Sequence, residues 1–348
     1  MPRFASSRPS PGLRPTLKLR PASRTASRAL GIAVLLAGAS LAAAPGVRNA
    51  SARQAPPQAP AAAPSGAVSF EVLVTRNGVP VDALTAGDVV LRDAGVVQTA
   101  QVEPASARPL SVQLAFDASA SVRGPAHDHL KAASQSTLAA LSPADDAGLI
   151  TFSHVVTRRI GFTSSKTDFE GALASIVAQG STALTDAVAA SLMASAAPGR
   201  RWLIVIFSDG DDTASWLSPA DAVEDARRSS AVMSSVLLEG AGNLGASIAK
   251  SAGDRAARQA APIDQWLIVE PGLYRSALLP RLAAETGGDL VTIADTAKLA
   301  ATVGDIIARV NRRYVITYTP TGVPARGWHP IQLEVKGAEV ISRLGFLR

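Results

Sequence analysis

The stretch WLIVIFSDG, residues 202–210, decides how this chain folds. Its first six residues are apolar without interruption, which is typical of a central strand covered on both faces of a sheet. A polar triplet containing Asp209 follows at once, and an apolar run at residues 110–116 is followed in the same way by Asp117. Ligands of open α/β sheets bind beyond the carboxyl ends of the strands. The two carboxylates are therefore predicted to meet at one edge of a sheet.

Outward from these strands, residues 109–312 alternate strand-like and helix-like segments. Strands are expected at residues 110–116, 147–152, 155–160, 202–207, 232–238 and 290–293. Helices are expected at residues 127–141, 168–178, 186–196, 219–228, 276–286 and 296–309. This order predicts an α/β fold, a doubly wound and mostly parallel sheet with helices on both faces. Residues 240–265, rich in Ala, Gly and charge, are interpreted as a surface insertion.

Strand patterning with a period of two flanks this α/β region. Residues 67–108 contain a half-buried strand and two turn signals, and residues 313–348 contain two alternating segments joined by a loop rich in Pro and Gly. Neither segment has enough strands to be stable by itself. We therefore expect the two to pair into one small β-sandwich, since the ends of a domain often lie close together.

The first 44 residues predict an export signal. Residues 1–28 carry seven basic residues and no acidic one, and residues 29–44 form an apolar, alanine-rich run that ends in small residues. A bilayer-spanning helix needs about 20 apolar residues, so the shorter run favours cleavage over a retained anchor. The protein is expected to be exported, periplasmic or extracellular, with membrane contact only through this segment if it stays uncleaved. Residues 45–66, rich in Ala, Pro and Gln, predict a disordered linker.

Composition excludes several classes of function. The formal net charge of +6 comes from the N-terminal segment, because without residues 1–28 the chain has 27 basic and 28 acidic residues. The folded part is therefore not basic, and no nucleic-acid partner is expected. The chain contains no Cys and only four His. Disulfides and thiolate sites are excluded, and a zinc or copper site is not expected.

Three short segments offer hard oxygen ligands to one cation. They are DASAS at 117–121, GST at 180–182 and SDG at 208–210. Each one alone would be an ordinary turn or helix cap, but each also stands at a strand end or helix start. Carboxylates and hydroxyls suit Mg²⁺ or Mn²⁺. We predict one such ion per chain, with room left for water and an incoming oxygen, held by Asp117, Ser119, Ser121, Thr182 and Asp209.

On these motifs the chain resembles a von Willebrand factor type A domain. The resemblance rests on FDASAS at 116–121, GSTALTDAV at 180–188 and VIFSDGDDT at 205–213, and it extends over about residues 68–348. It is similar above all to the secreted bacterial branch of the family, in which a short β segment precedes the domain. Ala120 stands where the family often has Gly, and Thr185 where an aromatic residue is common.

The resemblance implies a Rossmann-like fold and a function. The family's metal-ion-dependent adhesion site falls on the five predicted ligands. What this implies is an adhesion or protein-binding module that engages an acidic side chain of a protein partner through the metal. Around the site, Asp186 is interpreted as support for a helix start, and Asp211 and Asp212 as solvated or as neighbours of the ligands. Trp216 is a candidate to frame a partner site, whereas Trp202 begins a core strand.

Enzymatic alternatives fit the residues less well. A phosphotransferase of the haloacid dehalogenase type also has an Asp after a strand, but it needs a second Asp two residues on, where this chain has Ser119. A serine hydrolase needs a Gly-x-Ser-x-Gly elbow, and a P-loop enzyme needs its Gly-rich phosphate loop; the sequence contains neither. No catalytic residue is therefore predicted, and a metal-dependent phosphotransferase or hydrolase stays the second hypothesis.

Overall fold

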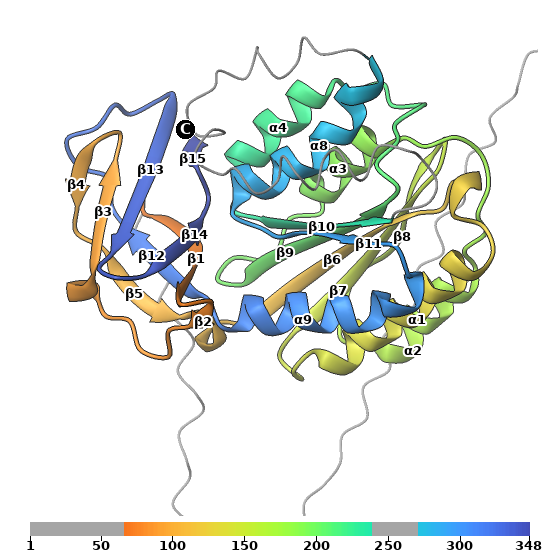
Figure 1. Cartoon of the computed structure of the whole chain (residues 1–348), viewed down its shortest axis with the longest axis horizontal. Helices are drawn as coiled ribbons and strands as arrows, with labels where there is room; N and C mark the ends of the chain where they lie inside the picture. Colours follow the sequence, from red (N-terminus) through yellow and green to blue (C-terminus); the bar gives the residue numbers. More distant parts are fainter. Residues whose placement is uncertain (1–65, 239–270) are drawn as a thin grey trace, which may run out of the picture. The chain divides into compact units, whose positions relative to one another are not determined.

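The computed structural model describes residues 66–238 and 271–348. The predicted export signal, nearly all of the predicted linker and the predicted insertion lie outside the described residues. The described part contains one mixed sheet with helices and two further antiparallel sheets (Figure 1). Within these residues, no helix is both long enough and apolar enough to cross a bilayer.

The central sheet has the strand order β11-β10-β9-β6-β7-β8. Its pairings are parallel except that of β8, which runs antiparallel to β7. The strands are β6 (Leu110–Asp117), β7 (Asp146–Phe152), β8 (Val156–Thr163), β9 (Arg201–Ser208), β10 (Val232–Leu238) and β11 (Leu290–Ile293). A mixed α/β sheet, as the sequence predicts, is confirmed.

Helices pack on both faces of this sheet. One hydrophobic cluster joins it to α1, α2 and α9, and a second joins it to α3, α4 and α8 (Figure 1). The helices are α1 (Pro125–Ala140), α2 (Lys166–Ala174), α3 (Leu184–Met193), α4 (Pro219–Arg228), α8 (Pro271–Thr286) and α9 (Leu299–Asn311). Short 3₁₀ turns are η1 (Ala86–Asp88), η2 (Ala105–Ala107), η3 (Ala120–Val122) and η4 (Thr296–Lys298).

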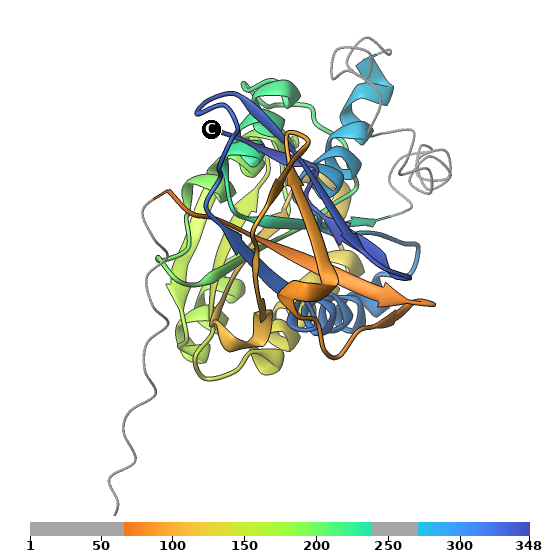
Figure 2. The same cartoon turned by 90° about the vertical axis from the view of Figure 1, so that its left-hand side faces the viewer.

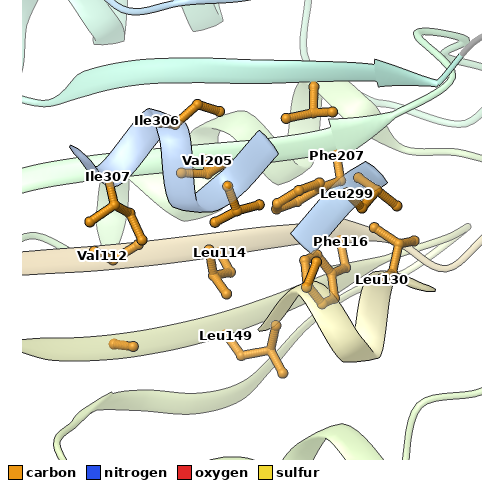
Figure 3. Close-up of a cluster of buried hydrophobic side chains, with 14 of the residues drawn as sticks. Val112, Leu114, Phe116, Leu130, Leu149, Val205, Phe207, Leu299, Ile306 and Ile307 are labelled. Atoms are coloured by element: carbon orange, nitrogen blue, oxygen red, sulfur yellow. The ribbon is translucent and has the colours of Figure 1, made fainter. Parts of the chain in front are cut away.

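The side chains of β6 and β9 alternate between the two faces of the sheet, which explains why apolar residues predominate in both strands, although β6 also buries Ser111 and Gln113. Leu114, Phe116, Val205 and Phe207 enter the cluster shared with α1 and α9 (Figure 3). The rings of Phe116 and Phe207 meet edge to face, with centroids 4.9 Å apart. Ile206 points into the opposite cluster. Rigid packing on both sides fixes where these two strands end.

Local capping sets the helix boundaries. The Ser218 hydroxyl accepts a hydrogen bond from Asp221 N–H and Pro219 is the first residue of α4, so this helix has the predicted bounds. Ser165 caps α2 in the same way and starts it two residues before the prediction, and α2 also ends earlier than predicted, at Ala174.

Strands from both flanking segments are paired with one another (Figure 2). One sheet has the order β14-β1-β12-β5, with β2 on β1, and the other has the order β15-β13-β3-β4. A third hydrophobic cluster contains residues from both sheets. The strands are β1 (Val68–Arg76), β2 (Val79–Pro80), β3 (Val89–Asp93), β4 (Val96–Gln98), β5 (Gln101–Pro104), β12 (Tyr314–Tyr318), β13 (Trp328–Val335), β14 (Glu339–Ser342) and β15 (Gly345–Leu347).

Two buried arginines join these sheets to the α/β part. The guanidinium of Arg201, at the start of β9, donates to both carboxylate oxygens of Glu71 on β1, at 3.0 and 3.2 Å, and to the carbonyl of Val310. Arg343, between β14 and β15, donates to the carbonyl of Ser229 just after α4. Both buried cations have several acceptors, so removing either would leave acceptors buried and unpaired.

Candidate metal centre

The two predicted carboxylates lie at the same edge of the central sheet. Asp117 is the last residue of β6, and Asp209 directly follows the last residue of β9. The strands are parallel neighbours, and their register sets Phe116 opposite Phe207. The residues that follow therefore emerge together beyond the carboxyl ends of the strands, where ligands of such sheets bind.

The first loop, residues 117–121, is folded on itself by hydrogen bonds. Ser119 N–H donates to Oδ1 of Asp117 at 2.9 Å, and the hydroxyl oxygens of Ser119 and Ser121 are 2.9 Å apart. Ala120 begins the turn η3 and does not adopt the left-handed backbone that favours glycine. Alanine therefore causes no backbone strain here. The structure brings the three predicted side chains of this loop together.

The second loop, residues 180–182, lies against the first. Ala120 N–H donates to the carbonyl of Gly180 at 2.9 Å. Gly180 has φ +81°, and a Cβ added to it would overlap the ring of His154. Only glycine fits both conditions. Thr182, the predicted ligand of this loop, is buried two residues later.

The third loop, residues 209–217, is tied to the second. Thr213 N–H and Ala214 N–H both donate to the carbonyl of Thr182, at 2.8 and 2.9 Å, and Thr182 N–H donates to the hydroxyl of Thr213 at 2.9 Å. Within the described residues, no hydrogen bond joins the Thr182 hydroxyl to the other four predicted ligands. The backbone nevertheless holds this residue between the first and third loops.

Asp212 explains why a threonine stands at position 185. Its Oδ2 accepts hydrogen bonds from the Thr185 hydroxyl at 2.6 Å and from Thr185 N–H at 2.9 Å. Burial favours the neutral form of Asp212, but the hydrogen bonds from Thr185 and Ser215 outweigh it and hold the pKa below its ordinary value. Asp212 is half-buried and supports the loops beside the predicted ligands.

Asp117 is in the opposite electrostatic situation. Burial raises its pKa from 3.8 to about 6, hydrogen bonds from Ser119 and Ser208 lower it, and the nearby charge of Asp209 raises it. No basic side chain is among these influences. The chain thus holds two carboxylates close together with one of them desolvated, and a bound cation relieves that combination. The residues present fit a divalent ion with oxygen ligands.

Sequence reasoning overlooked one residue that shapes this centre. The hydroxyl of Ser208 donates to Oδ2 of Asp117 at 2.8 Å and accepts from Gly210 N–H at 3.1 Å. Asp117 therefore has both oxygens oriented from within the chain. The available signal was the position of Ser208, a hydroxyl between a buried strand and Asp209. Among the described residues, no three His, Cys, Asp or Glu side chains are grouped as metal ligands would be; the predicted ligand set has only two carboxylates, and its other oxygens are hydroxyls.

Histidines near these loops have structural partners. A ring nitrogen of His127 is 3.1 Å from the carbonyl of Ile176, and His129 is 2.8 Å from the Thr296 hydroxyl. Both rings therefore contact neighbouring segments, and neither is among the predicted ligands.

Residues 112–211 match a family model, that of the von Willebrand factor type A domain. No curated protein matches the chain. Among solved structures, it is similar to the conserved hypothetical protein BatB from Bacteroides thetaiotaomicron, with 16% identity, 58% of this chain and 98% of that chain covered, and a TM-score of 0.42.

Two further structures are similar at comparable levels. A von Willebrand factor type A protein from Catenulispora acidiphila has 13% identity, with 83% of this chain and 75% of that chain covered and a TM-score of 0.43. Proximal thread matrix protein 1 from the mussel byssus, described with a zinc-occupied MIDAS motif, has 15% identity, with 62% and 49% covered and a TM-score of 0.44.

Proposed function

The chain carries a von Willebrand factor type A domain, and we propose that it works as a metal-dependent protein-binding module and not as an enzyme. The observation that carries the proposal is the convergence of oxygen ligands at the carboxyl ends of β6 and β9, around a buried Asp117 that has no basic partner among the described residues. Mg²⁺ or Mn²⁺ is the ion that such donors suit.

The residues of the proposed centre have different roles. Asp117 and Asp209 would supply the two negative charges, and the hydroxyls of Ser119, Ser121 and Thr182 would supply neutral oxygens. Ser208 and the backbone amide of Ser119 keep Asp117 oriented. A bound divalent cation supplies a positive charge with a coordination position that an acidic side chain of a partner protein can take.

Two carboxylates nominally balance the charge of the ion. A partner carboxylate would then be held only weakly by the ion itself, so contacts around the centre have to contribute much of the affinity. Binding should be modest, reversible and abolished by chelation. This partner, the export of the protein and its periplasmic or extracellular location are all parts of the same proposal.

Calorimetry tests the metal site. Mg²⁺ and Mn²⁺ should each bind once per chain, and Asp117→Ala should weaken that binding at least 100-fold, since it removes one of two charged ligands. Asp168→Ala, which changes an exposed aspartate of α2, is the matched control and should bind the ion like the wild type. Equal affinity in Asp117→Ala and wild type would falsify the site.

Partner binding needs a second experiment. The protein is immobilised with Mg²⁺, exposed to the cell envelope fraction of its own host, and washed with EDTA. The expected result is a protein released by EDTA and not retained by Asp209→Ala. A partner that binds at full strength in EDTA contradicts the metal-bridged mechanism. Phosphatase and esterase assays should show no turnover, and metal-dependent turnover would favour the enzymatic alternative.

A further inference from the structure

The loop between β9 and α4 exposes an unusually large apolar side chain. Trp216 is 96% exposed and its neighbour Leu217 is 42% exposed. Tryptophan is usually well buried in folded proteins, and its indole has a large apolar area that gains free energy when water is removed from it. Exposed tryptophans are also enriched among the residues that dominate protein interfaces. The pair therefore needs a reason to be on the surface.

Loop flexibility does not account for this exposure, because the backbone around Trp216 is held by side chains. Asp186, on α3, accepts hydrogen bonds from Trp216 N–H at 3.1 Å and from Leu217 N–H at 3.0 Å. Ser215 N–H donates to Asp212, and the Ser215 hydroxyl accepts from Asp186 N–H. The indole is thus presented by a loop that is ordered before any partner arrives, which lowers the entropy lost on binding.

The position of the loop connects Trp216 to the candidate metal centre. Ala214 N–H donates to the carbonyl of Thr182, a predicted ligand, at 2.9 Å. Trp216 is two residues further on, and two residues span at most about 7 Å. The same loop begins at Asp209, another predicted ligand. The exposed indole therefore stands at the rim of the centre.

The charge around this rim favours a protein partner over a membrane. Residues 209–221 contain four aspartates and no lysine or arginine. Such a segment is repelled by anionic lipid headgroups, whereas membrane-binding loops carry basic residues beside their aromatic ones. A peptide segment carries only one carboxylate, which the cation attracts, and its apolar side chain meets the indole without any charge, so it meets less repulsion than a lipid surface.

We infer that Trp216 and Leu217 are specificity-determining residues of this module, and that they select a protein segment with a large apolar side chain within a few residues of its acidic one. This inference rests on the proposed function and adds to it the chemistry of the partner. The carboxylate supplies the metal-dependent part of the recognition, and burial of the indole supplies apolar affinity that does not depend on the metal's charge.

A displayed library of disulfide-closed heptapeptides tests the inference with a defined probe. The library is selected on the wild-type protein in Mg²⁺, and bound peptides are released with EDTA. We expect the released peptides to combine an Asp or Glu with a nearby aromatic or large aliphatic residue. Synthetic versions should lose at least tenfold in affinity for Trp216→Ala and an intermediate factor for Trp216→Phe.

A matched variant and a metal titration keep the result specific. Met193→Ala removes another highly exposed apolar side chain, 84% exposed at the far end of α3, and should change peptide affinity less than twofold. Trp216→Ala should bind Mg²⁺ like the wild type, which shows that its loops are intact.

The possible outcomes separate this inference from the proposed function. Peptides that are released by EDTA but bind Trp216→Ala as tightly as the wild type overturn the inference and leave the metal-dependent module standing. If EDTA releases no peptide, the proposed function is contradicted and the inference falls with it. A blue shift of Trp216 fluorescence with anionic phosphatidylglycerol vesicles, lost in Trp216→Ala, would show a membrane surface as the partner and also overturn it.

Discussion

Two buried aspartates of this molecule, Asp93 and Asp117, differ in the groups that surround their carboxylates. Asp93, at the end of β3, accepts a hydrogen bond from the Tyr318 hydroxyl at 2.9 Å, and its other oxygen is 2.8 Å from Nδ1 of His329. The ring of His329 stacks on Phe346. Asp117, only 1% exposed, receives hydrogen bonds from neutral groups and lies near a second carboxylate. Both oxygens of Asp93 thus have side-chain partners, whereas no basic side chain of the described residues is among the influences on Asp117.

The difference separates a structural carboxylate from one that we propose binds a cation. Tyr318 belongs to one antiparallel sheet, and Asp93 and His329 belong to the other. Their network therefore fixes how two sheets pack, and burial together with Asp93 raises the pKa of the Tyr318 hydroxyl. At Asp117 the hydrogen bonds from Ser119 and Ser208 offset the desolvation only in part, and no basic side chain of the described residues adds to them. A cation bound there, as we propose, would supply the counter-charge.

The largest expected effect is the loss of stability when the hydrogen bonds around Asp93 are removed. Asp93→Ala leaves the Tyr318 hydroxyl and the His329 ring buried without their acceptor, which should lower the free energy of unfolding by about 3–5 kcal/mol. Urea denaturation followed by circular dichroism measures it. Asp82→Ala, at a highly exposed aspartate of the same β region, should change it by less than about 0.5 kcal/mol. If Asp93→Ala and Asp82→Ala had equal effects, the hydrogen bonds of Asp93 would contribute no more to stability than those of an exposed aspartate.

Substitution of Asp117, in contrast, is expected to raise the free energy of unfolding of the metal-free protein. A rise in pKa from 3.8 to about 6 corresponds to roughly 3 kcal/mol between the two protonation states of Asp117. In metal-free protein this costs stability above the folded pKa and is relieved as the pH falls from about 7 toward 4, because the folded state then binds the proton more tightly. Asp117→Asn should therefore stabilise the metal-free protein at pH 7, by up to about 3 kcal/mol.

Denaturation at pH 4 and pH 7 in EDTA checks this sign. The advantage of Asp117→Asn over the wild type should shrink at the lower pH, where the wild-type carboxyl is protonated in the folded state. A variant that is less stable than the wild type at pH 7 would mean that the carboxylate is already compensated within the chain.

A divalent cation should stabilise the wild-type protein by binding at Asp117. With Mg²⁺ at 100 times its dissociation constant, the wild type should gain about 2.7 kcal/mol in its free energy of unfolding, since the ion binds only the folded state. Asp117→Asn should gain almost nothing. Paired denaturation curves in MgCl₂ and in EDTA measure both. A similar gain in the two proteins would show that the ion binds elsewhere.

The smallest effect distinguishes the acceptors of two tyrosines. Tyr318→Phe removes a hydrogen bond to a carboxylate and should cost about 1.5–3 kcal/mol, whereas Tyr314→Phe removes one to the carbonyl of Val81 and should cost about 1 kcal/mol. The same denaturation assay compares them. If Tyr314→Phe lowers the free energy of unfolding more than Tyr318→Phe does, the hydrogen bonds around Asp93 contribute less to stability than we expect.

The sequence predicted the central sheet well because its signals are local. The strands Val232–Leu238 and Leu290–Ile293 have the predicted bounds, and the helix Pro219–Arg228 is bounded by a capping serine and a proline that can be recognised without tertiary contacts. The family resemblance rested on motifs of this local kind and is confirmed by the match over residues 112–211.

Other features were beyond such reasoning because they join distant residues. Tyr318 and His329 contact Asp93 although each is more than 220 residues away from it in the sequence. No sequence pattern in either segment predicts these contacts. The support that Asp212 gives to Thr185 has the same origin, since it depends on how two loops approach. At the candidate centre, the sequence predicted which residues would gather, and the identity of the ion and of the five ligands stays a prediction.

The pairing of β1 with β12 has a consequence for how the chain is made. Val68 lies opposite Tyr318, so β1, except for Thr75 and Arg76 that pair with the nearby β2, waits for about 250 further residues before its neighbour is synthesised. Contacts this far apart in sequence form late, because a long loop has to close before they stabilise anything. Until then β1 has exposed apolar residues and unpaired backbone groups. A chain truncated by its last 35 residues would therefore keep all six strands of the central sheet yet be prone to aggregation.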